Sequence, residues 1–214
     1  FDSIIKEVEA DLEIQYDSLQ KDAIYKALTH QFFILTGGPG TGKTTVIKGI
    51  IRAYAALHKV DLNPDNYTDD VFPIVQVAPT GRAARRMNEL TGLPAATIHR
   101  QLGLNSDDLE DDFGNDLSGS LLIVDEFSMV DTWLANKLFA AIPPSMTVIL
   151  VGDADQLPSV GPGQVFADLL KIPDFASVKL DKIFRQGEDS TITNLSFVIK
   201  DGQLPSDFTA KKTD

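Results

Sequence analysis

The sequence contains no cysteine, which excludes disulfide bonds and thiolate-bound metal sites. No apolar run approaches the roughly 20 residues that a membrane-spanning helix needs, and no basic-then-apolar leader opens the sequence. These absences fit a reducing, cytoplasmic location. A chain of 214 residues, 43% of them hydrophobic, is long and apolar enough to bury a core.

Basic residues are scarce: 19 Lys and Arg stand against 31 Asp and Glu, which gives a net charge of −12. Such a charge disfavours nonspecific binding to a polyanion. Much of the excess lies in the segments 61–70 and 107–116, which carry four and six acidic residues and no basic one. We interpret both segments as solvated loops or insertions, and local basic surface can then exist elsewhere.

The most informative stretch present is a glycine-rich loop at Gly37–Thr44, which fits the phosphate-loop pattern G-x-x-x-x-G-K-[ST]. An apolar run at 32–35 precedes it as a buried strand would, and apolar residues at helical spacing follow it. Backbone N–H groups of such a loop, together with the positive end of the following helix, bind phosphates. Lys43 is expected to reach the β- and γ-phosphates, and Thr44 to bind Mg²⁺. The predicted nucleotide-binding residues of the loop are Gly38, Pro39, Gly40, Thr41, Gly42, Lys43, Thr44 and Thr45.

A second apolar run, at 120–125, ends in the adjacent carboxylates Asp125 and Glu126. In company with a phosphate loop this is the Walker B arrangement. Asp125 is expected to hold Mg²⁺, and Glu126 to polarise the attacking water as general base. A further strand, at 147–151, leads into a loop where Gln156 is placed to sense the γ-phosphate.

The strands are continuously apolar and alternate with helical segments, which predicts an α/β fold with a mostly parallel sheet and helices on both faces. We expect a second helix from Ser18, with Ser18 as its N-cap. The expected organisation is a helical segment at 1–30, an ATPase domain at 31–187, and a helix and tail at 188–214.

A predicted helix after Thr80 carries Arg82, Arg85 and Arg86 on one stripe by i, i+3 and i, i+4 spacing. Three arginines in an acidic protein could grip a phosphate backbone. They could equally form a solvated face paired with acidic residues.

Three single residues are ambiguous by themselves. Gln20 offers one donor and one acceptor that could pair with adenine, but it is also an ordinary surface helix residue. A lone histidine such as His99 is usually structural. Arg185 follows the last predicted strand and fits either a surface ion pair or an arginine finger.

Taken together, the motifs resemble those of superfamily 1 DNA helicases, and within them the RecD-like group, which includes the exodeoxyribonuclease V alpha subunit. The segments that carry the resemblance stand in the family's order and cover about residues 18–187. They are Gln20 with Ala23-Ile24, Gly37–Thr45, Ala78–Ala84, Thr97–Arg100, Val124–Met129, Val151–Val160 and Phe184–Gln186.

The resemblance implies a RecA-like P-loop NTPase fold and a role for each matching position. Gln20 would read adenine, Gln156 would couple the γ-phosphate to DNA, and Arg185 would stabilise the transition state. The residues expected along single-stranded DNA are Pro79, Thr80, Arg82, Thr97 and His99.

The resemblance also implies an ATP-dependent motor that acts in DNA repair or recombination and moves 5′ to 3′. Such helicases hold ATP between two RecA-like domains, and nothing after Arg185 resembles the second one. We therefore expect an isolated first motor domain that binds ATP·Mg²⁺, hydrolyses it poorly and cannot unwind DNA alone. The expected partners are single-stranded DNA, the second domain of the same parent chain, and nuclease or helicase subunits.

Two other interpretations remain. A kinase or GTPase would also carry a phosphate loop, although the guanine-specific N-K-x-D is absent from the sequence. A non-catalytic module could use ATP merely to fix a partner-binding surface. Glu126 and Arg185 argue against such a module, since a pure binder needs neither.

Overall fold

The computed structural model describes residues 1–68, 70–104 and 115–184. Six strands of this part form one sheet with the spatial order β3-β2-β4-β5-β1-β6. Every neighbouring pair in the sheet is parallel. The strands are β1 (Phe32–Gly37), β2 (Ile74–Ala78), β3 (Ala96–Thr97), β4 (Leu121–Val124), β5 (Thr147–Gly152) and β6 (Ala176–Leu180).

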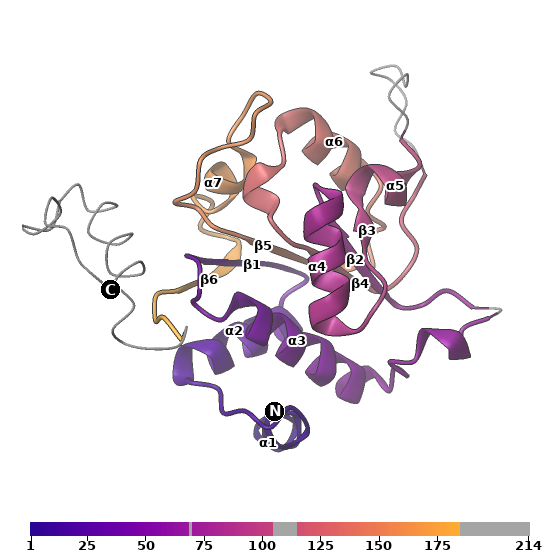
Figure 1. Ribbon diagram of the computed structural model, residues 1–214, viewed down its shortest axis with the longest axis vertical. Coiled ribbons are helices and arrows are strands. Elements are labelled where there is room, and N and C mark those ends of the chain that lie inside the picture. Colours follow the sequence, from indigo (N-terminus) through magenta and orange to yellow (C-terminus); the bar gives the residue numbers. More distant parts are fainter. Residues whose placement is uncertain (69, 105–114, 185–214) are drawn as a thin grey trace, which may run out of the picture.

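Helices cover both faces of the sheet, as Figure 1 shows, with α1, α2 and α3 below it and α5, α6 and α7 above it. The described α-helices are α1 (Asp2–Asp11), α2 (Ser18–Thr29), α3 (Lys43–His58), α4 (Gly81–Thr91), α5 (Ile98–Leu102), α6 (Thr132–Ala140) and α7 (Val165–Leu169). Two short 3₁₀ turns, η1 (Pro64–Asn66) and η2 (Phe127–Met129), lie in the connections. None of the described helices is long and apolar enough to cross a membrane.

The strands read as continuous apolar runs because each face of the sheet has its own apolar layer. Successive side chains of a strand point to opposite faces. In β1, Phe33 and Leu35 belong to the layer that includes α2 and α3, whereas Ile34 belongs to the layer that includes α5 and α6. Burial on both faces is typical of parallel sheets in α/β proteins.

The two N-terminal helices share the apolar layer of β1 and α3. Their link to the phosphate-loop helix includes Tyr16, whose hydroxyl donates a hydrogen bond of 3.1 Å to the backbone carbonyl of Thr45. Burial raises the pKa of the Tyr16 phenol well above its ordinary value. The helical segment therefore packs directly behind the phosphate loop.

The expected N-cap of α2 was wrong by one residue. Asp17, not Ser18, caps the helix: its Oδ1 accepts from the backbone N–H of Gln20 at 2.8 Å. Gln20 Oε1 in turn accepts from the backbone N–H of Asp17 at 3.2 Å. This reciprocal capping box requires an acceptor followed three residues later by Gln or Glu, and only Asp17 has Gln20 at that spacing.

The predicted fold class, a parallel sheet covered by helices on both faces, is confirmed. The strand β3 was not predicted, because two residues are too short to leave an apolar run. Helix α7 begins at Val165, shortly after Gly163, which has a φ of 102°. Residues 107–114 of the second acidic segment, and the whole region 185–214, lie outside the described residues. The domain boundaries stay predictions.

Candidate active site

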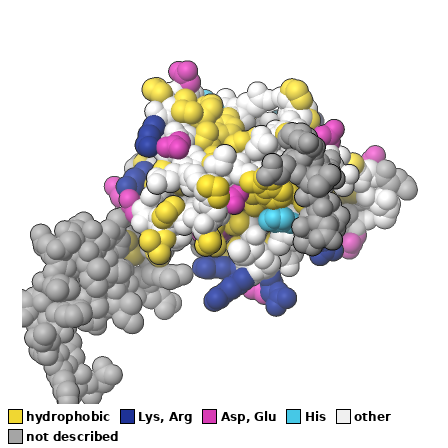
Figure 2. Space-filling view, turned by 90° about the horizontal axis from the view of Figure 1, so that it is seen from above, with side chains coloured by type: hydrophobic (Ala, Val, Ile, Leu, Met, Phe, Trp, Pro, Cys, Tyr) yellow, Lys and Arg dark blue, Asp and Glu magenta, His cyan; other side chains and the backbone are white. Residues whose placement is uncertain are grey.

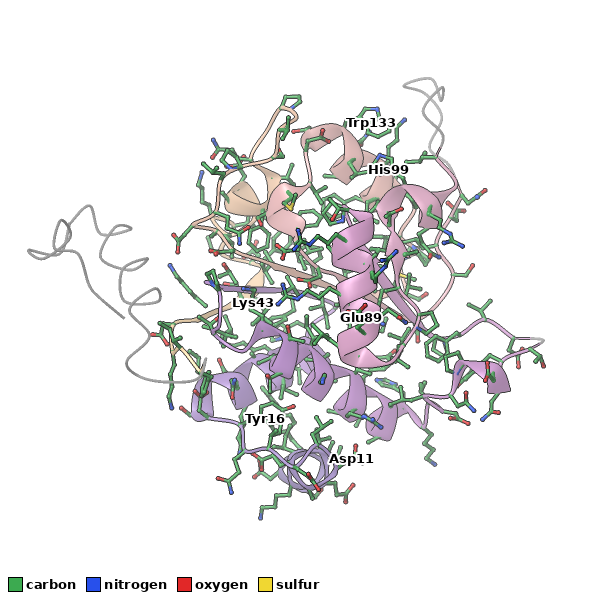
Figure 3. All side chains as sticks on the ribbon, viewed as in Figure 1. Asp11, Tyr16, Lys43, Glu89, His99 and Trp133 are labelled. Carbon is green, nitrogen blue, oxygen red and sulfur yellow. The ribbon has the colours of Figure 1, made fainter. Side chains whose placement is uncertain are left out.

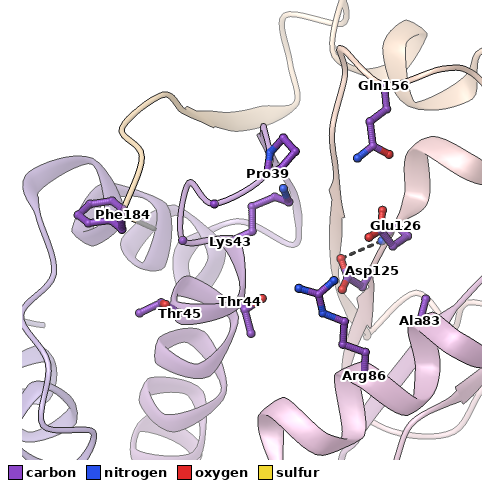
Figure 4. A pocket seen from close by; sticks show the side chains of 12 residues that line it. Pro39, Lys43, Thr44, Thr45, Ala83, Arg86, Asp125, Glu126, Gln156 and Phe184 are labelled. Atoms are coloured by element: carbon purple, nitrogen blue, oxygen red, sulfur yellow. Dashed lines mark hydrogen bonds between the residues drawn. The ribbon is translucent and has the colours of Figure 1, made fainter. Parts of the chain in front are cut away.

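The phosphate loop, the carboxylates after β4 and the loop after β5 meet at one cleft of about 400 Å³. Parallel strands end at the same edge of the sheet, and this edge is where open α/β sheets bind ligands. Figure 4 shows the side chains that face one another across the cleft. The lining residues are Pro39, Gly40, Gly42, Lys43, Thr44, Thr45, Ala83, Arg86, Asp125, Glu126, Gln156 and Phe184.

Two glycines give the phosphate loop its curvature. Gly40 and Gly42 have φ angles of 78° and 87°, a left-handed conformation that is strained for residues with a side chain. Gly42 is the N-cap of α3, so the helix begins at Lys43 and its positive end faces the cleft. The loop therefore turns tightly and leads directly into the N-terminus of α3.

The Lys43 ammonium lies inside the loop. Its Nζ donates to the carbonyl oxygens of Gly37 at 2.6 Å and Gly38 at 3.0 Å. Burial lowers the pKa of Lys43, while the charges of Asp153 and Asp125 act in the opposite direction. A phosphate that enters the cleft can take over these hydrogen bonds and offset the cost of burying the ammonium.

Asp125 and Glu126 follow β4 and differ in their environment. Burial raises the pKa of the Asp125 carboxyl, although the backbone N–H of Glu126 donates to its Oδ1 at 2.8 Å. Glu126 has a φ of 52°, which is costly for a residue with a side chain. Burial, and next the charge of Asp125, raise the pKa of Glu126. Backbone strain and raised carboxyl pKa values cluster at functional sites.

The loop after β5 brings Gln156 over the carboxylates, as Figure 4 shows. Its first turn is fixed to β1, since the backbone N–H of Ala154 donates to Thr36 Oγ1 at 3.2 Å. The buried Asp153 accepts from the backbone N–H of Asp155 at 3.0 Å. Gln156 itself is exposed, so it can reach a ligand in the cleft.

Thr44 and Asp125, the expected metal ligands, line the same cleft. Within the described residues no group of three or more His, Cys, Asp or Glu side chains could hold a metal ion alone. One hydroxyl and one carboxylate nevertheless suit Mg²⁺, which keeps several waters and takes its other ligands from substrate phosphates. The donor set therefore fits Mg²⁺ that enters together with a nucleotide.

Gln20 does not line the cleft, but it lies directly behind the loop. A Cβ atom on Gly42 would stand 2.7 Å from Gln20 Nε2. The Gln20 Oε1 atom already accepts the capping hydrogen bond from Asp17. Its use as an adenine reader therefore requires this side chain to turn toward the cleft.

Three lining residues were not predicted as site residues: Ala83, Arg86 and Phe184. Phe184 reaches the cleft from the segment after β6, where its backbone N–H donates to the Gly40 carbonyl at 2.9 Å. Arg86 reaches it from α4, one turn after Ala83. All three belong to segments noted in the sequence, but the sequence does not show which side chains of these segments face the phosphate loop.

The residues expected at DNA lie apart from the lining of the cleft. Strand pairing aligns Ala78 with Thr97, so the segments after β2 and β3 begin side by side. Thr80 Oγ1 caps α4 by accepting from the Ala83 N–H at 3.2 Å, and Thr97 Oγ1 caps α5 by accepting from the Arg100 N–H at 3.1 Å. Pro79 is half-buried.

Arg82 and His99 are exposed. The His99 ring stacks on Trp133 of α6, with ring centroids 6.1 Å apart and an interplanar angle of 29° (Figure 3). Figure 2 shows Lys and Arg side chains gathered at one edge of a face that also carries a histidine and apolar side chains. Arg185 lies outside the described residues.

A parallel sheet with a phosphate loop after β1 and paired carboxylates after β4 defines a RecA-like P-loop nucleotide-binding domain. The chain belongs to the AAA domain family, whose model matches residues 20–162. Over most of its length it is a homologue of the RecD and RecD2 helicases.

Two relatives show how similar the chain is to known helicases and how much of their length it covers. The chain is 36% identical over 178 residues to the ATP-dependent RecD2 DNA helicase of Deinococcus radiodurans. The matched region covers 83% of this chain and 23% of that protein. It is 36% identical over 171 residues to the RecBCD enzyme subunit RecD of Mycolicibacterium smegmatis, with 71% of this chain and 30% of that protein covered. The chain thus spans less than a third of the length of these relatives.

A solved structure supports the fold. The Pif1 helicase of Candida albicans matches with a TM-score of 0.62 at 23% identity, over 91% of this chain and 46% of that one. At this identity the likeness shows the fold alone. It agrees with the RecA-like architecture derived above.

Proposed function

We propose that this chain is the first motor domain of an ATP-dependent DNA helicase or translocase that acts on single-stranded DNA. The observation that carries the proposal is the convergence of Lys43, Thr44, Asp125, Glu126 and Gln156 on one cleft. They supply a phosphate-binding cation, metal ligands, a base and a γ-phosphate sensor. A nucleotide-binding module without catalysis would need neither the base nor the sensor.

Hydrolysis in this site would proceed by attack of water on the γ-phosphate. Glu126 would accept the proton of that water, and its raised pKa makes it a better proton acceptor than an ordinary glutamate. Gln156 would orient the water or the γ-phosphate from the opposite side. Thr44 and Asp125 would hold Mg²⁺, which when bound neutralises charge on the β- and γ-phosphates.

The adenine base would lie between the phosphate loop and the segment after β6. The Phe184 ring is 46% exposed and lines the cleft, so it offers an open aromatic face. The Gln20 amide lies next to Gly42 on the same side and supplies the hydrogen-bonding groups that distinguish adenine from guanine. The Gln20 amide therefore supports a preference for ATP over GTP, whereas Phe184 supports stacking of either base.

Single-stranded DNA would run over the ends of β2 and β3. Pro79, Thr80 and Thr97 lie there, and Arg82 and His99 are exposed on the helices that follow. Arginine would contact phosphate, while the His99–Trp133 stack would meet bases. Movement 5′ to 3′ and a role in recombination or repair follow from the likeness to RecD-like helicases.

Catalysis at full rate would need a second RecA-like domain of the same parent chain. The chain covers 23% of the RecD2 helicase that it resembles. An arginine finger contributes about 10³–10⁵ in rate, so a first domain alone should turn over slowly. Since several relatives are subunits of the RecBCD enzyme, helicase and nuclease subunits are further proposed partners. We also propose a cytoplasmic location, because the relatives are DNA-processing enzymes.

The test is ATP binding and hydrolysis by this chain with and without a single-stranded oligonucleotide, with Lys43→Ala as the control. We expect a nucleotide-dependent rise in melting temperature that Lys43→Ala removes. Ligand at ~100-fold excess over Kd adds roughly 2.7 kcal/mol. Turnover should be slow and should fall further in Glu126→Gln.

The outcomes separate the alternatives. A preference for GTP over ATP would indicate another P-loop enzyme. Fast, DNA-stimulated turnover that needs Lys43 would show that the site is complete within this chain or between copies of it. If Glu126→Gln in the full-length parent left ATP turnover unchanged, Glu126 would have no catalytic role. ATP binding by that parent without any turnover would indicate a nucleotide-gated binding module.

A further inference from the structure

The cleft contains a second cation that the nucleotide-binding motifs do not include. Arg86 lies on α4, and Figure 4 shows its guanidinium directed across the cleft toward Lys43 and Asp125. Lys43 approaches from the phosphate loop, whereas Arg86 approaches from the facing wall. A phosphate group between the two walls would therefore meet positive charge from both sides.

The orientation of Arg86 follows from how α4 packs. Ala84 and Met87 are the buried residues of this helix, and α4 packs on β2 and β3 through this side. Ala83 and Arg86, one turn apart, then face the cleft. Arg82 and Arg85 are not among the lining residues, so the arginine stripe expected from the sequence divides between two environments.

Within the described part of the chain, Arg86 forms no ion pair and no hydrogen bond. Its charge nevertheless acts on three groups of the site: burial lowers the pKa of Lys43 and Arg86 adds to this, whereas burial raises the pKa values of Asp125 and Glu126 and Arg86 partly opposes it. Asp125 and Glu126 place two negative charges in the cleft, against one positive charge on Lys43. Among the lining side chains, Arg86 balances the second of these negative charges.

We propose that Arg86, which lies on α4 of the same domain, binds the terminal phosphate of the bound nucleoside triphosphate. The terminal phosphate is the relevant group because Glu126, which would activate the attacking water, lies in the part of the cleft that Arg86 faces. A guanidinium donates two parallel hydrogen bonds to a phosphate, which a lysine does not. This inference rests on the proposed nucleotide-binding function.

The contact would connect the two proposed sites directly. Helix α4 begins after Thr80, and Arg82 lies four residues before Arg86 on the same helix. A terminal phosphate held by Arg86 would bias the position of α4, and therefore of the residues expected at DNA. Loss of that phosphate on hydrolysis would release the helix.

The experiment compares the binding of a non-hydrolysable ATP analogue and of ADP, each with Mg²⁺, to the full chain and three variants. Arg86→Ala should weaken binding of the triphosphate about 10- to 100-fold, as expected for charge-assisted hydrogen bonds, and binding of ADP less than about threefold. Arg86→Lys should fall between, because it keeps charge but not the bidentate geometry. Arg85→Ala, an exposed neighbour on the same helix, should match the unchanged protein for both ligands.

Each outcome decides one point. Equal losses for ATP analogue and ADP would overturn the proposal, because they indicate a general effect on the cleft rather than a terminal-phosphate contact. Tighter Mg²⁺-nucleotide binding by Arg86→Ala would also overturn it, because the guanidinium would then compete with the metal for Asp125. If the unchanged chain binds neither ligand, the proposed function fails, and not this inference alone.

Discussion

The backbone N–H of Phe184 donates a hydrogen bond to the carbonyl oxygen of Gly40, with an N···O distance of 2.9 Å. This bond joins the segment after β6 to the phosphate loop. It sets the Phe184 ring beside Gly42, where a Cβ atom would lie 3.5 Å from the ring and 2.7 Å from Gln20 Nε2. The Phe184 ring and the Gln20 amide therefore both lie against the phosphate loop.

Phe184→Ala should weaken the binding of ATP and ADP to the same degree, because the base is common to both. Stacking of a base on an aromatic ring contributes about 1–3 kcal/mol, so a loss of roughly 5- to 150-fold is expected. Phe184→Tyr should retain binding, and Phe184→Leu should lose it despite its apolar side chain. Equilibrium titration of the two nucleotides measures this. Full binding by Phe184→Leu would contradict a stacking role.

Gly42→Ala should damage the site more than the fold, and Gly92→Ala provides a matched control. Both glycines have left-handed φ angles, 87° and 73°, so each substitution should cost about 1–2 kcal/mol of stability. A Cβ on Gly92 meets nothing within 4 Å, whereas one on Gly42 would displace the Gln20 amide. Thermal unfolding without nucleotide should therefore show similar losses, with Gly42→Ala somewhat the larger. Nucleotide titration should show a loss for Gly42→Ala alone, and equal affinities would contradict the role of this loop.

The parts of the site that sequence could predict are those encoded by local pattern. The phosphate loop needs glycines at fixed spacing, and Asp125 and Glu126 follow a continuous apolar run. The positions of the loop and of the two carboxylates at the sheet edge can therefore be predicted without a structure. Arg86 and Phe184 depend on tertiary packing. The rotation of α4 about its axis is set by Ala84 and Met87 against the sheet, and a spacing of i, i+3 and i, i+4 does not reveal it.

Glu126→Gln should stabilise the nucleotide-free protein at neutral pH. The pKa of Glu126 is raised above its ordinary 4.5, so ionising it costs more in the folded than in the unfolded state. That cost is fully present above the folded-state pKa and disappears as the pH falls below 4.5. The melting temperature of Glu126→Gln should therefore exceed that of the unchanged chain at pH 7.5, and the difference should vanish near pH 4.

Glu89→Gln is the control for this pH dependence, because Glu89 is an exposed residue of α4 that does not line the cleft. Its melting temperature should follow that of the unchanged chain at both pH values. A stabilising effect at the cost of turnover would fit a strained, charged site that is maintained for function. A drop in the melting temperature of Glu126→Gln at pH 7.5 would show instead that the carboxylate is held by favourable contacts.

Trp133 gives a direct test of the proposed DNA-binding face, because it is the one tryptophan of the sequence. Its ring stacks on His99 and lies 5.6 Å from Lys137 Nζ. A single-stranded oligonucleotide whose bases stack on this pair should change the tryptophan emission, and the change should weaken as salt is raised. Fluorescence titration at two salt concentrations measures both effects.

His99→Ala should weaken oligonucleotide binding about fivefold or more, the lower end of a base-stacking contribution. His58→Ala is its matched control, since His58 also packs on an aromatic ring, Tyr54, with centroids 4.2 Å apart. His58 ends α3, a 16-residue helix that begins at the phosphate loop, so it lies about 20 Å from the site end of that helix. Equal losses in the two variants would contradict a base-stacking role of His99. A loss confined to His99→Ala places the bases on the face formed by α5 and α6.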